Sequence, residues 1–264
     1  MTDDHTFLSP VSRNRAKVIA DLERSAGRKE HGLFRIEGWR ALQSAADAGA
    51  ALAEVVVRSD ALDATRLTLL KSLKTQVFTV GSKGMSRLTS VLQDQGVVAT
   101  AQIRNDTIDD LVPAKRLLGL NGVQDPGNVG TLIRTAAWFG VEGVVADGGT
   151  ADFYNPKVVR AAAGALWDVH LVRTDSLVEP LASLKKAGFS CYGTDVGSAE
   201  DSRWREMDRC VLVLGSEGHG MQEEIRALMD GFVHVNRSAS RSRGVESLNV
   251  ATAGSILIAR WVSN

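Results

Sequence analysis

The sequence predicts an α/β fold in two domains, a small amino-terminal domain and a larger one built on a mostly parallel sheet. Before residue 105, short strand signals alternate with amphipathic segments, which is typical of a small α/β domain. From residue 116 the strands become continuous apolar runs, and such runs indicate parallel strands covered by helices on both faces. The stretch 105–115 is polar and lacks strong periodicity, so we place the linker there.

The smaller domain is expected over residues 13–104, after a flexible tail at 1–12. Residues 13–28 read as one amphipathic helix, because Ala16, Ile19 and Ala20 fall on one face. The remaining elements follow from period-two strand patterns and alanine-rich helical patterns. They are strands at 33–38, 54–58, 75–80 and 96–103, and helices at 39–48 and 86–93.

The larger domain is expected over residues 116–264. Its strands carry no polar alternation, and helical patterns of ordinary length separate them, as in doubly wound α/β proteins. The expected strands are 117–120, 143–146, 170–172, 190–192, 211–214 and 232–235, and the expected helices are 129–139, 156–164, 177–187, 222–229 and 250–261.

Composition excludes several classes of protein. A hydrophobic fraction of 44% and a charged fraction of 23% are those of a globular protein, and no apolar run approaches the roughly 20 residues of a membrane span. Residues 1–5 are acidic and precede no apolar signal segment, so a cytoplasmic protein is expected. Cys191 and Cys210 are too few and too far apart for a zinc motif; two buried thiols are expected, although one disulfide stays open. The net charge is zero, so any RNA-binding surface must be local.

The first segment with candidate chemistry is 125–134, where the chain leaves a strand and opens a helix. Asn128 is expected to be the N-cap of this helix. Arg134 is expected to point away from the apolar face. A helix cap and a surface arginine would explain the segment equally well if it stood alone.

Two further segments have a similar character. Residues 212–220 form an apolar strand that breaks into a loop with three glycines, which allow a backbone to approach a ligand closely. Residues 246–254 place Ser247 and Asn249 at the mouth of the last helix, where either could cap it. A tight turn and a helix cap are the plainer interpretations of these two segments.

In this order and spacing, the three segments resemble the three signature motifs of the SpoU-type (TrmH-like) ribose methyltransferases, in the trefoil-knotted SPOUT superfamily. Residues 155–165 also resemble that family, and the likeness covers 116–261. Residues 12–17 and 32–38 resemble the RNA-recognition domain of the ribosomal-RNA-modifying members. The resemblance implies a small ribosomal-protein-like α/β RNA-binding domain followed by a mostly parallel α/β sheet with a deep trefoil knot.

The resemblance also implies an activity. The chain is expected to move a methyl group from S-adenosyl-L-methionine to a ribose 2'-hydroxyl of RNA, first of all ribosomal RNA, as a homodimer, without a membrane partner or a metal. The implied catalytic residues are Asn128, Arg134, Glu217, Ser247 and Asn249. The implied cofactor-binding residues are Leu214, Gly215, Ser216, Gly218, Val235, Leu248 and Asn249. Because a guanidinium is protonated at ordinary pH, Arg134 is either a base assisted by a substrate phosphate or an electrostatic clamp.

Contacts with RNA are expected from basic residues in three parts of the chain. The family usually has a short proline-containing turn between Val235 and Ser247, whereas this chain has a longer loop with three arginines. For that loop, contact with RNA phosphates and a plain solvated loop are equally open. The expected RNA-binding residues are Arg13, Arg15, Lys17, Arg28, Lys29, Arg160, Arg237, Arg241 and Arg243.

Three alternative functions are open at this point. A transfer RNA ribose methyltransferase and a base N-methyltransferase would use a similar scaffold, and mapping the methylated product distinguishes them. An inactive RNA-binding or ribosome-assembly protein would lack the motif residues that this chain retains. A methyltransferase with an unknotted Rossmann fold fits poorly, because no glycine fingerprint follows an early strand.

Overall fold

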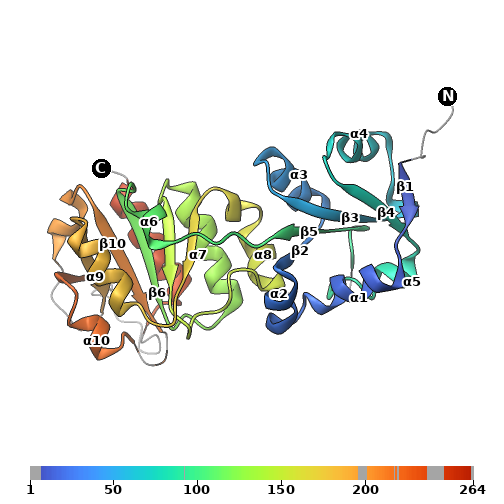
Figure 1. Ribbon diagram of the computed structural model, residues 1–264. Coiled ribbons are helices and arrows are strands. Elements are labelled where there is room, and N and C mark those ends of the chain that lie inside the picture. Colours follow the sequence, from blue (N-terminus) through green and yellow to red (C-terminus); the bar gives the residue numbers. More distant parts are fainter. Residues whose placement is uncertain are drawn as a thin grey trace. The chain divides into compact units, whose positions relative to one another are not determined.

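The computed structural model describes residues 7–91, 93–195, 201–216, 218, 220–236 and 247–262 (Figure 1). These residues form two compact units. Unit 1 is the described part of Met1–Arg104 together with Tyr154–Trp167. Unit 2 is the described part of Asn105–Phe153 and Asp168–Asn264.

Unit 1 is built on a five-stranded sheet of order β1-β4-β3-β5-β2. The strands β1, β4 and β3 run parallel, and β5 pairs antiparallel with both β3 and β2. Apolar side chains of the sheet, of the first helix and of the segment after β4 form a core that includes Ile19, Val56, Phe78 and Met85. The elements of unit 1 are β1 Leu8–Pro10, α1 Arg13–Asp21, α2 Ser25–His31, β2 Leu33–Glu37, α3 Trp39–Asp47, β3 Leu52–Arg58, η1 Ser59–Ala61, α4 Ala64–Ser72, β4 Gln76–Val80, α5 Ser82–Met85, β5 Val97–Gln102, α8 Pro156–Ala162 and η2 Ala165–Trp167.

Several elements of unit 1 differ from the sequence-based expectation. The tail expected at 1–12 contains β1, which pairs with β4 so that Leu8 lies opposite Val77. The single helix expected at 13–28 is two helices, α1 and α2, and the helix expected at 86–93 is replaced by the short α5. The helix α4 was not anticipated. For β1, pairing with a distant strand outweighs the local pattern.

The segment Tyr154–Trp167 belongs to unit 1, although the sequence analysis assigned it to the larger domain. Its helix α8 packs against β2 (Figure 1). The ring of Phe34 lies 4.7 Å from that of Tyr154 and 5.7 Å from that of Trp167, measured between centroids. The segment therefore completes the apolar core around Phe34, which periodicity within the segment could not indicate.

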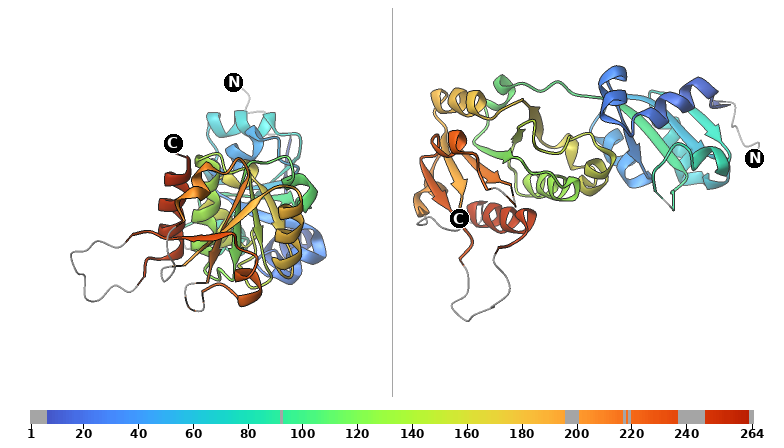
Figure 2. Two further views of the ribbon diagram at one scale, coloured as in Figure 1. Left: turned by 90° about the vertical axis from the view of Figure 1, so that its left-hand side faces the viewer. Right: turned by 90° about the horizontal axis from the view of Figure 1, so that it is seen from below.

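Unit 2 is built on six parallel strands in the order β11-β9-β10-β6-β7-β8. The helices α6, α9 and α10 contribute to the core on one face, while α7 and α11 lie side by side on the other (Figure 2). Both faces are thus covered, as the apolar runs predicted. The elements of unit 2 are α6 Ile108–Leu111, β6 Arg116–Asn121, α7 Pro126–Trp138, β7 Gly143–Ala146, β8 His170–Arg173, α9 Val178–Lys186, β9 Ser190–Thr194, η3 Ser202–Glu206, β10 Cys210–Gly215, α10 Glu223–Arg226, β11 Gly231–Val233 and α11 Val250–Val262.

The stretch 105–115, expected as a linker, lies within unit 2. Its helix α6 begins at a capping box in which the backbone N–H of Thr107 donates to Asp110 at 2.7 Å, and its hydroxyl does so at 2.8 Å. These two hydrogen bonds hold the pKa of Asp110 below its usual value. The side chain of Leu111 is fully buried in the core of unit 2, which anchors the stretch.

Candidate functional site

The helix α7, which carries the first motif, begins one turn earlier than the sequence suggested. Its N-cap is Asp125, whose carboxylate accepts a hydrogen bond from the backbone N–H of Asn128 at 2.9 Å. The expectation that Asn128 is the N-cap was therefore wrong. Asp125 caps α7 in place of Asn128. Arg134 is exposed on the outer face of the helix.

The first and third motifs meet at a side-chain hydrogen bond. The amide Nδ2 of Asn249 donates to Oδ1 of Asn128 at 3.0 Å. The Oδ1 of Asn249 accepts from the backbone N–H groups of Ala251 at 2.9 Å and Thr252 at 3.2 Å, so Asn249 caps α11. The amide of Asn249 thus has partners on both its nitrogen and its oxygen, which fixes its orientation. Ser247 lies two residues before Asn249 and is exposed.

The second motif joins the other two through the packing of α11. A Cβ atom on Gly254 would lie 2.6 Å from Leu132 Cδ2 and 2.7 Å from Leu214 Cδ1, so a side chain there would displace the ends of both leucines. Leu132 belongs to α7 and Leu214 to β10. The hydroxyls of Thr135 and Ser255 lie 3.1 Å apart and connect the same two helices. The structure thus gathers the ends of all three motifs in unit 2.

The loop after β10 is a narrow turn at the carboxyl edge of the sheet. Ser216 and Gly220 exchange two backbone hydrogen bonds, each of 2.9 Å. A Cβ on Gly215 would lie 2.8 Å from the backbone of Gly220 and Met221, so a side chain there would push the turn open. Gly218 is exposed at the turn. The expected catalytic residue Glu217 lies outside the described residues.

A buried polar network lies beside this turn and was missed by the sequence analysis. Asn121 ends β6, and its Nδ2 donates to Asp147 Oδ2 at 2.6 Å, while its Oδ1 accepts from the N–H of Gln222 at 3.0 Å. Asp147 Oδ1 also accepts from Gly122 N at 3.0 Å and from Thr150 N at 2.9 Å. Polar residues directly after apolar strands could have indicated this network, because the ends of parallel strands meet at one edge of the sheet.

The expected cofactor-binding residues lie around that edge. Leu214 is buried, Gly215 and Ser216 are half-buried, and Val235 follows β11 and is half-buried. Leu248 is 43% exposed although it is apolar.

The expected RNA-binding residues fall into four groups, of which Arg160 is the last. Arg13, Arg15, Lys17 and Lys29 are exposed on unit 1. Arg28 is a correction: its side chain is 2% exposed, and its Nη1 donates to the carbonyls of Leu22 and Glu23, both at 2.9 Å, where α1 ends. Its charge therefore holds the α1–α2 corner together instead of facing RNA. Arg237, Arg241 and Arg243 lie outside the described residues.

Arg160, also expected to contact RNA, is half-buried and forms an ion pair within unit 1. Its Nη1 lies 3.4 Å from Glu37 Oε2, and the two residues belong to unit 1. The side chain of Glu37 is 6% exposed. Arg160 thus neutralises a buried carboxylate and links α8 to β2.

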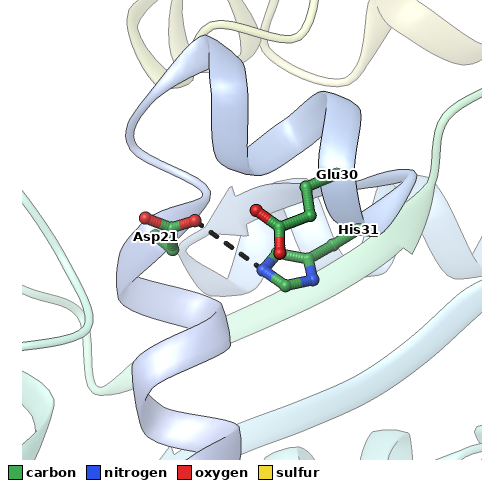
Figure 3. Close-up of side chains that lie close together, drawn as sticks. All are labelled: Asp21, Glu30 and His31. Carbon is green, nitrogen blue, oxygen red and sulfur yellow. Dashed lines mark ion pairs between the residues drawn. The ribbon is translucent and has the colours of Figure 1, made fainter.

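Among the described residues, one group of side chains has the spacing of metal ligands: Asp21, Glu30 and His31 in unit 1 (Figure 3). The His31 Nε2 lies 3.7 Å from Asp21 Oδ2, and Arg24 also forms an ion pair with Asp21. The guanidinium already neutralises that carboxylate, so we assign no chemistry to this group.

The two cysteines lie on neighbouring strands as free, buried thiols. Burial raises the pKa of Cys191 to about 12 and also raises that of Cys210. Both are therefore protonated, unreactive core residues. In the described parts of the chain, no helix combines the length and apolarity needed to cross a bilayer.

Unit 2 has a parallel sheet, and parallel α/β domains generally bind their ligands at the carboxyl edge, where the first two motifs leave β6 and β10. The sequence profile of the SpoU rRNA Methylase family matches residues 115–259, and that of the MRM3-like substrate binding domain matches residues 13–99. The chain belongs to the SpoU rRNA Methylase family, the SpoU-type RNA methyltransferases of the SPOUT superfamily, whose methyl donor is S-adenosylmethionine.

Individual relatives agree with this family. The 23S rRNA (guanosine(2553)-2'-O)-methyltransferase RlmP of Bacillus subtilis is 30% identical over 252 residues, which are 95% of this chain and 97% of the relative. An AdoMet-bound rRNA methyltransferase from Sinorhizobium meliloti superposes with a TM-score of 0.83 at 25% identity and 97% coverage of both chains. The SpoU methyltransferase AviRb from Streptomyces viridochromogenes, at 24% identity and a TM-score of 0.85, covers 96% of this chain and 98% of its own and shares the fold.

Proposed function

We propose that this chain transfers the methyl group of S-adenosylmethionine to a ribose 2'-hydroxyl of ribosomal RNA in the cytoplasm. The observation that carries the proposal is the 3.0 Å hydrogen bond between Asn249 and Asn128, which joins the first and third motifs on the helix pair that presents Arg134. The names of two relatives, RlmP of Bacillus subtilis and RlmB of Bordetella pertussis, specify 23S rRNA, which supports this substrate.

The cofactor would be held at the carboxyl edge of the unit 2 sheet. Backbone groups of Leu214, Gly215, Ser216 and Gly218 would bind its polar edge, and Leu248 would cover its adenine ring. Val235 and Asn249 complete the set of cofactor-binding residues. When bound, S-adenosylmethionine supplies an electrophilic methyl carbon attached to a positively charged sulfur.

Arg134 would clamp an RNA phosphate and stabilise the negative charge that develops on the attacking oxygen. A guanidinium keeps its proton at any ordinary pH, so in this role Arg134 does not accept the hydroxyl proton, which would leave to solvent water or to the clamped phosphate. Asn128, Ser247 and Asn249 would position the ribose, because the amides of Asn128 and Asn249 are hydrogen-bonded to each other. Glu217 completes the proposed catalytic set from the motif resemblance.

The decisive variant is Arg134→Ala. We expect methylation of RNA to fall by about 100- to 1,000-fold, the usual cost of removing one charge-stabilising donor. S-adenosylmethionine affinity, measured by calorimetry, should stay within about 2-fold, because the guanidinium serves the oxygen nucleophile. Thr131→Ala is the matched control, one turn earlier on the same exposed face of α7. A loss of cofactor affinity in Arg134→Ala would contradict the assignment.

The substrate is tested by mapping 2'-O-methyl positions in RNA from cells with and without the protein. We expect one ribose in ribosomal RNA to lose its methyl group. If only transfer RNA changes, the ribosomal substrate is wrong and the ribose chemistry stands. If the missing methyl group lies on a base, the chemistry itself is wrong.

A homodimer and the family's trefoil knot belong to the same proposal. Trp138 is 83% exposed on α7, one turn after Arg134, and a second copy of the chain would bury this indole beside the site. Light scattering should give the mass of a dimer for the native chain and of a monomer for Trp138→Glu; a native monomer would contradict the proposal. An experimental trace of residues 237–246 tests the knot, and an unthreaded chain would exclude it.

A further inference from the structure

Unit 1 contains a hollow of about 760 Å³ between β1, β4 and the end of α4. This volume is that of a small-ligand site, and the hollow is formed entirely by residues of unit 1. Its lining mixes polar and apolar groups, and the apolar part includes Leu70, Val77 and Phe78, which are 1%, 4% and 8% exposed. A mixed lining suits a ligand with a flat, uncharged part and a polar edge.

Two cations lie on the wall of the hollow, each beside an aromatic ring. The guanidinium carbon of Arg15 is 4.5 Å from the centroid of Phe78, and the Nζ of Lys71 is 5.8 Å from the centroid of Phe7. These distances are those of cation–π contacts. Such contacts keep a positive charge and an aromatic face next to each other, which is the pair of features that a nucleotide requires.

The charge around the hollow is not balanced. Arg15 donates to the buried carboxylate of Glu54 at 2.6 Å and to Gln76 at 3.2 Å, so its charge is matched and its position fixed. Lys71 is exposed and forms no ion pair with any described residue, and no described acidic residue lines the hollow. The rim therefore carries a positive charge suited to a phosphate.

We propose that this hollow binds an unpaired nucleotide of the RNA substrate, with its base stacked at Phe7 and its phosphate held by Lys71. The proposal rests on the proposed function, because it takes RNA as the substrate. Arg15 is a positioning residue in this arrangement, since its guanidinium packs on Phe78 and is tied to Glu54. The match of residues 13–99 to a substrate-binding domain supports a role of unit 1 in RNA binding but assigns no residue to it.

The test uses the full chain and two probes of equal length, a fluorescein-labelled single-stranded oligouridylate and a blunt RNA duplex. Phe7→Ala should weaken single-strand binding by about 5- to 50-fold in fluorescence anisotropy, the usual cost of losing one stacked base. Lys71→Glu should weaken it by about 5-fold or more and lower the salt dependence. Duplex binding should change less than about 2-fold in Phe7→Ala, because a paired base cannot stack in the hollow.

The control is Lys83→Glu, which makes the same charge change on α5 of the same unit, outside the lining of the hollow. Equal losses in Lys71→Glu and Lys83→Glu would overturn the proposal in favour of a diffuse electrostatic surface. Unchanged single-strand binding in Phe7→Ala, with an unchanged melting temperature, would overturn the stacking of a base. The proposed function is tested separately. It fails if the native chain methylates no RNA, and that result does not depend on how strongly the chain binds the oligonucleotides.

Discussion

The two units each bury a polar network, and the networks differ in kind. In unit 1, Arg35 and Glu37 form an ion pair at 2.7 Å, with side chains 2% and 6% exposed, and Arg160 lies on the other oxygen of Glu37. In unit 2, Asp147 is satisfied by neutral donors from Asn121, Gly122 and Thr150. In the first network opposite charges connect elements within the core of unit 1. In the second, one carboxylate holds the backbone of a loop through hydrogen bonds.

This difference has a functional consequence. The unit 1 network ties α8 to β2, so its loss should appear as lost stability. The unit 2 network holds the turn between β6 and α7 and bonds to Gln222 after the motif loop, so its loss should also appear in catalysis. In unit 2 the buried carboxylate is compensated by hydrogen bonds, whereas in unit 1 the Arg35 Nε and Glu37 Oε1 atoms form an ion pair without a hydrogen bond, so the opposite charges compensate their burial.

The largest effect on stability is expected from Arg35→Met. The change leaves Glu37 buried with less compensation, which costs about 3–5 kcal/mol in comparable pairs. Calorimetric melting should show the loss, while the turnover of the remaining folded protein stays near normal. Arg40→Met, at an exposed position of α3, is the control. An unchanged melting temperature would mean that the ion pair does not hold the core.

Asp147→Asn should separate activity from stability. An amide cannot accept at both of its terminal atoms, so one neighbouring N–H loses its partner at a cost of about 1–3 kcal/mol. Because the turn leads into α7, methylation should fall by about 10- to 100-fold in protein that remains folded. Asp175→Asn, on an exposed residue of the same unit, should retain activity. Normal turnover in Asp147→Asn would break the comparison between the two networks.

Gly254→Ala should have a smaller effect on the packing of the motif helices. The added methyl group would meet Leu132 and Leu214 at 2.6 and 2.7 Å, which costs about 1–3 kcal/mol and is partly offset by the better helix propensity of alanine. Chemical denaturation measures the change, with Thr252→Ala on the exposed face as the control. A stabilised variant would show that α7 and α11 can move apart without lowering the free energy of unfolding.

The smallest effect is expected at the two thiols. Burial raises the pKa of Cys191 to about 12 and also raises that of Cys210, so native protein should resist iodoacetamide at pH 8 and both thiols should react after unfolding. Above the usual thiol pKa, near 9, the folded state should lose the stability that these protonated thiols contribute. Rapid labelling of native protein would show that the sheet of unit 2 opens locally.

The sequence by itself determined the parallel sheet and the family. Continuous apolar runs place strands near 117–120 and 211–214 because a doubly covered strand has no polar face, and the three motifs are local patterns whose residues can be read in order. The exposure of Arg134 also followed from helical periodicity alone.

Only the tertiary structure decided which distant residues meet. Asn128 pairs with Asn249 in unit 2. Residues 154–167 complete the core of unit 1, and Arg28 turns inward to donate to two carbonyls. None of these follows from local periodicity, because each depends on partners brought together by folding. The role of a buried charge or amide depends on the residues that lie near it in space, whereas an apolar periodicity can be recognised from neighbouring residues in the sequence.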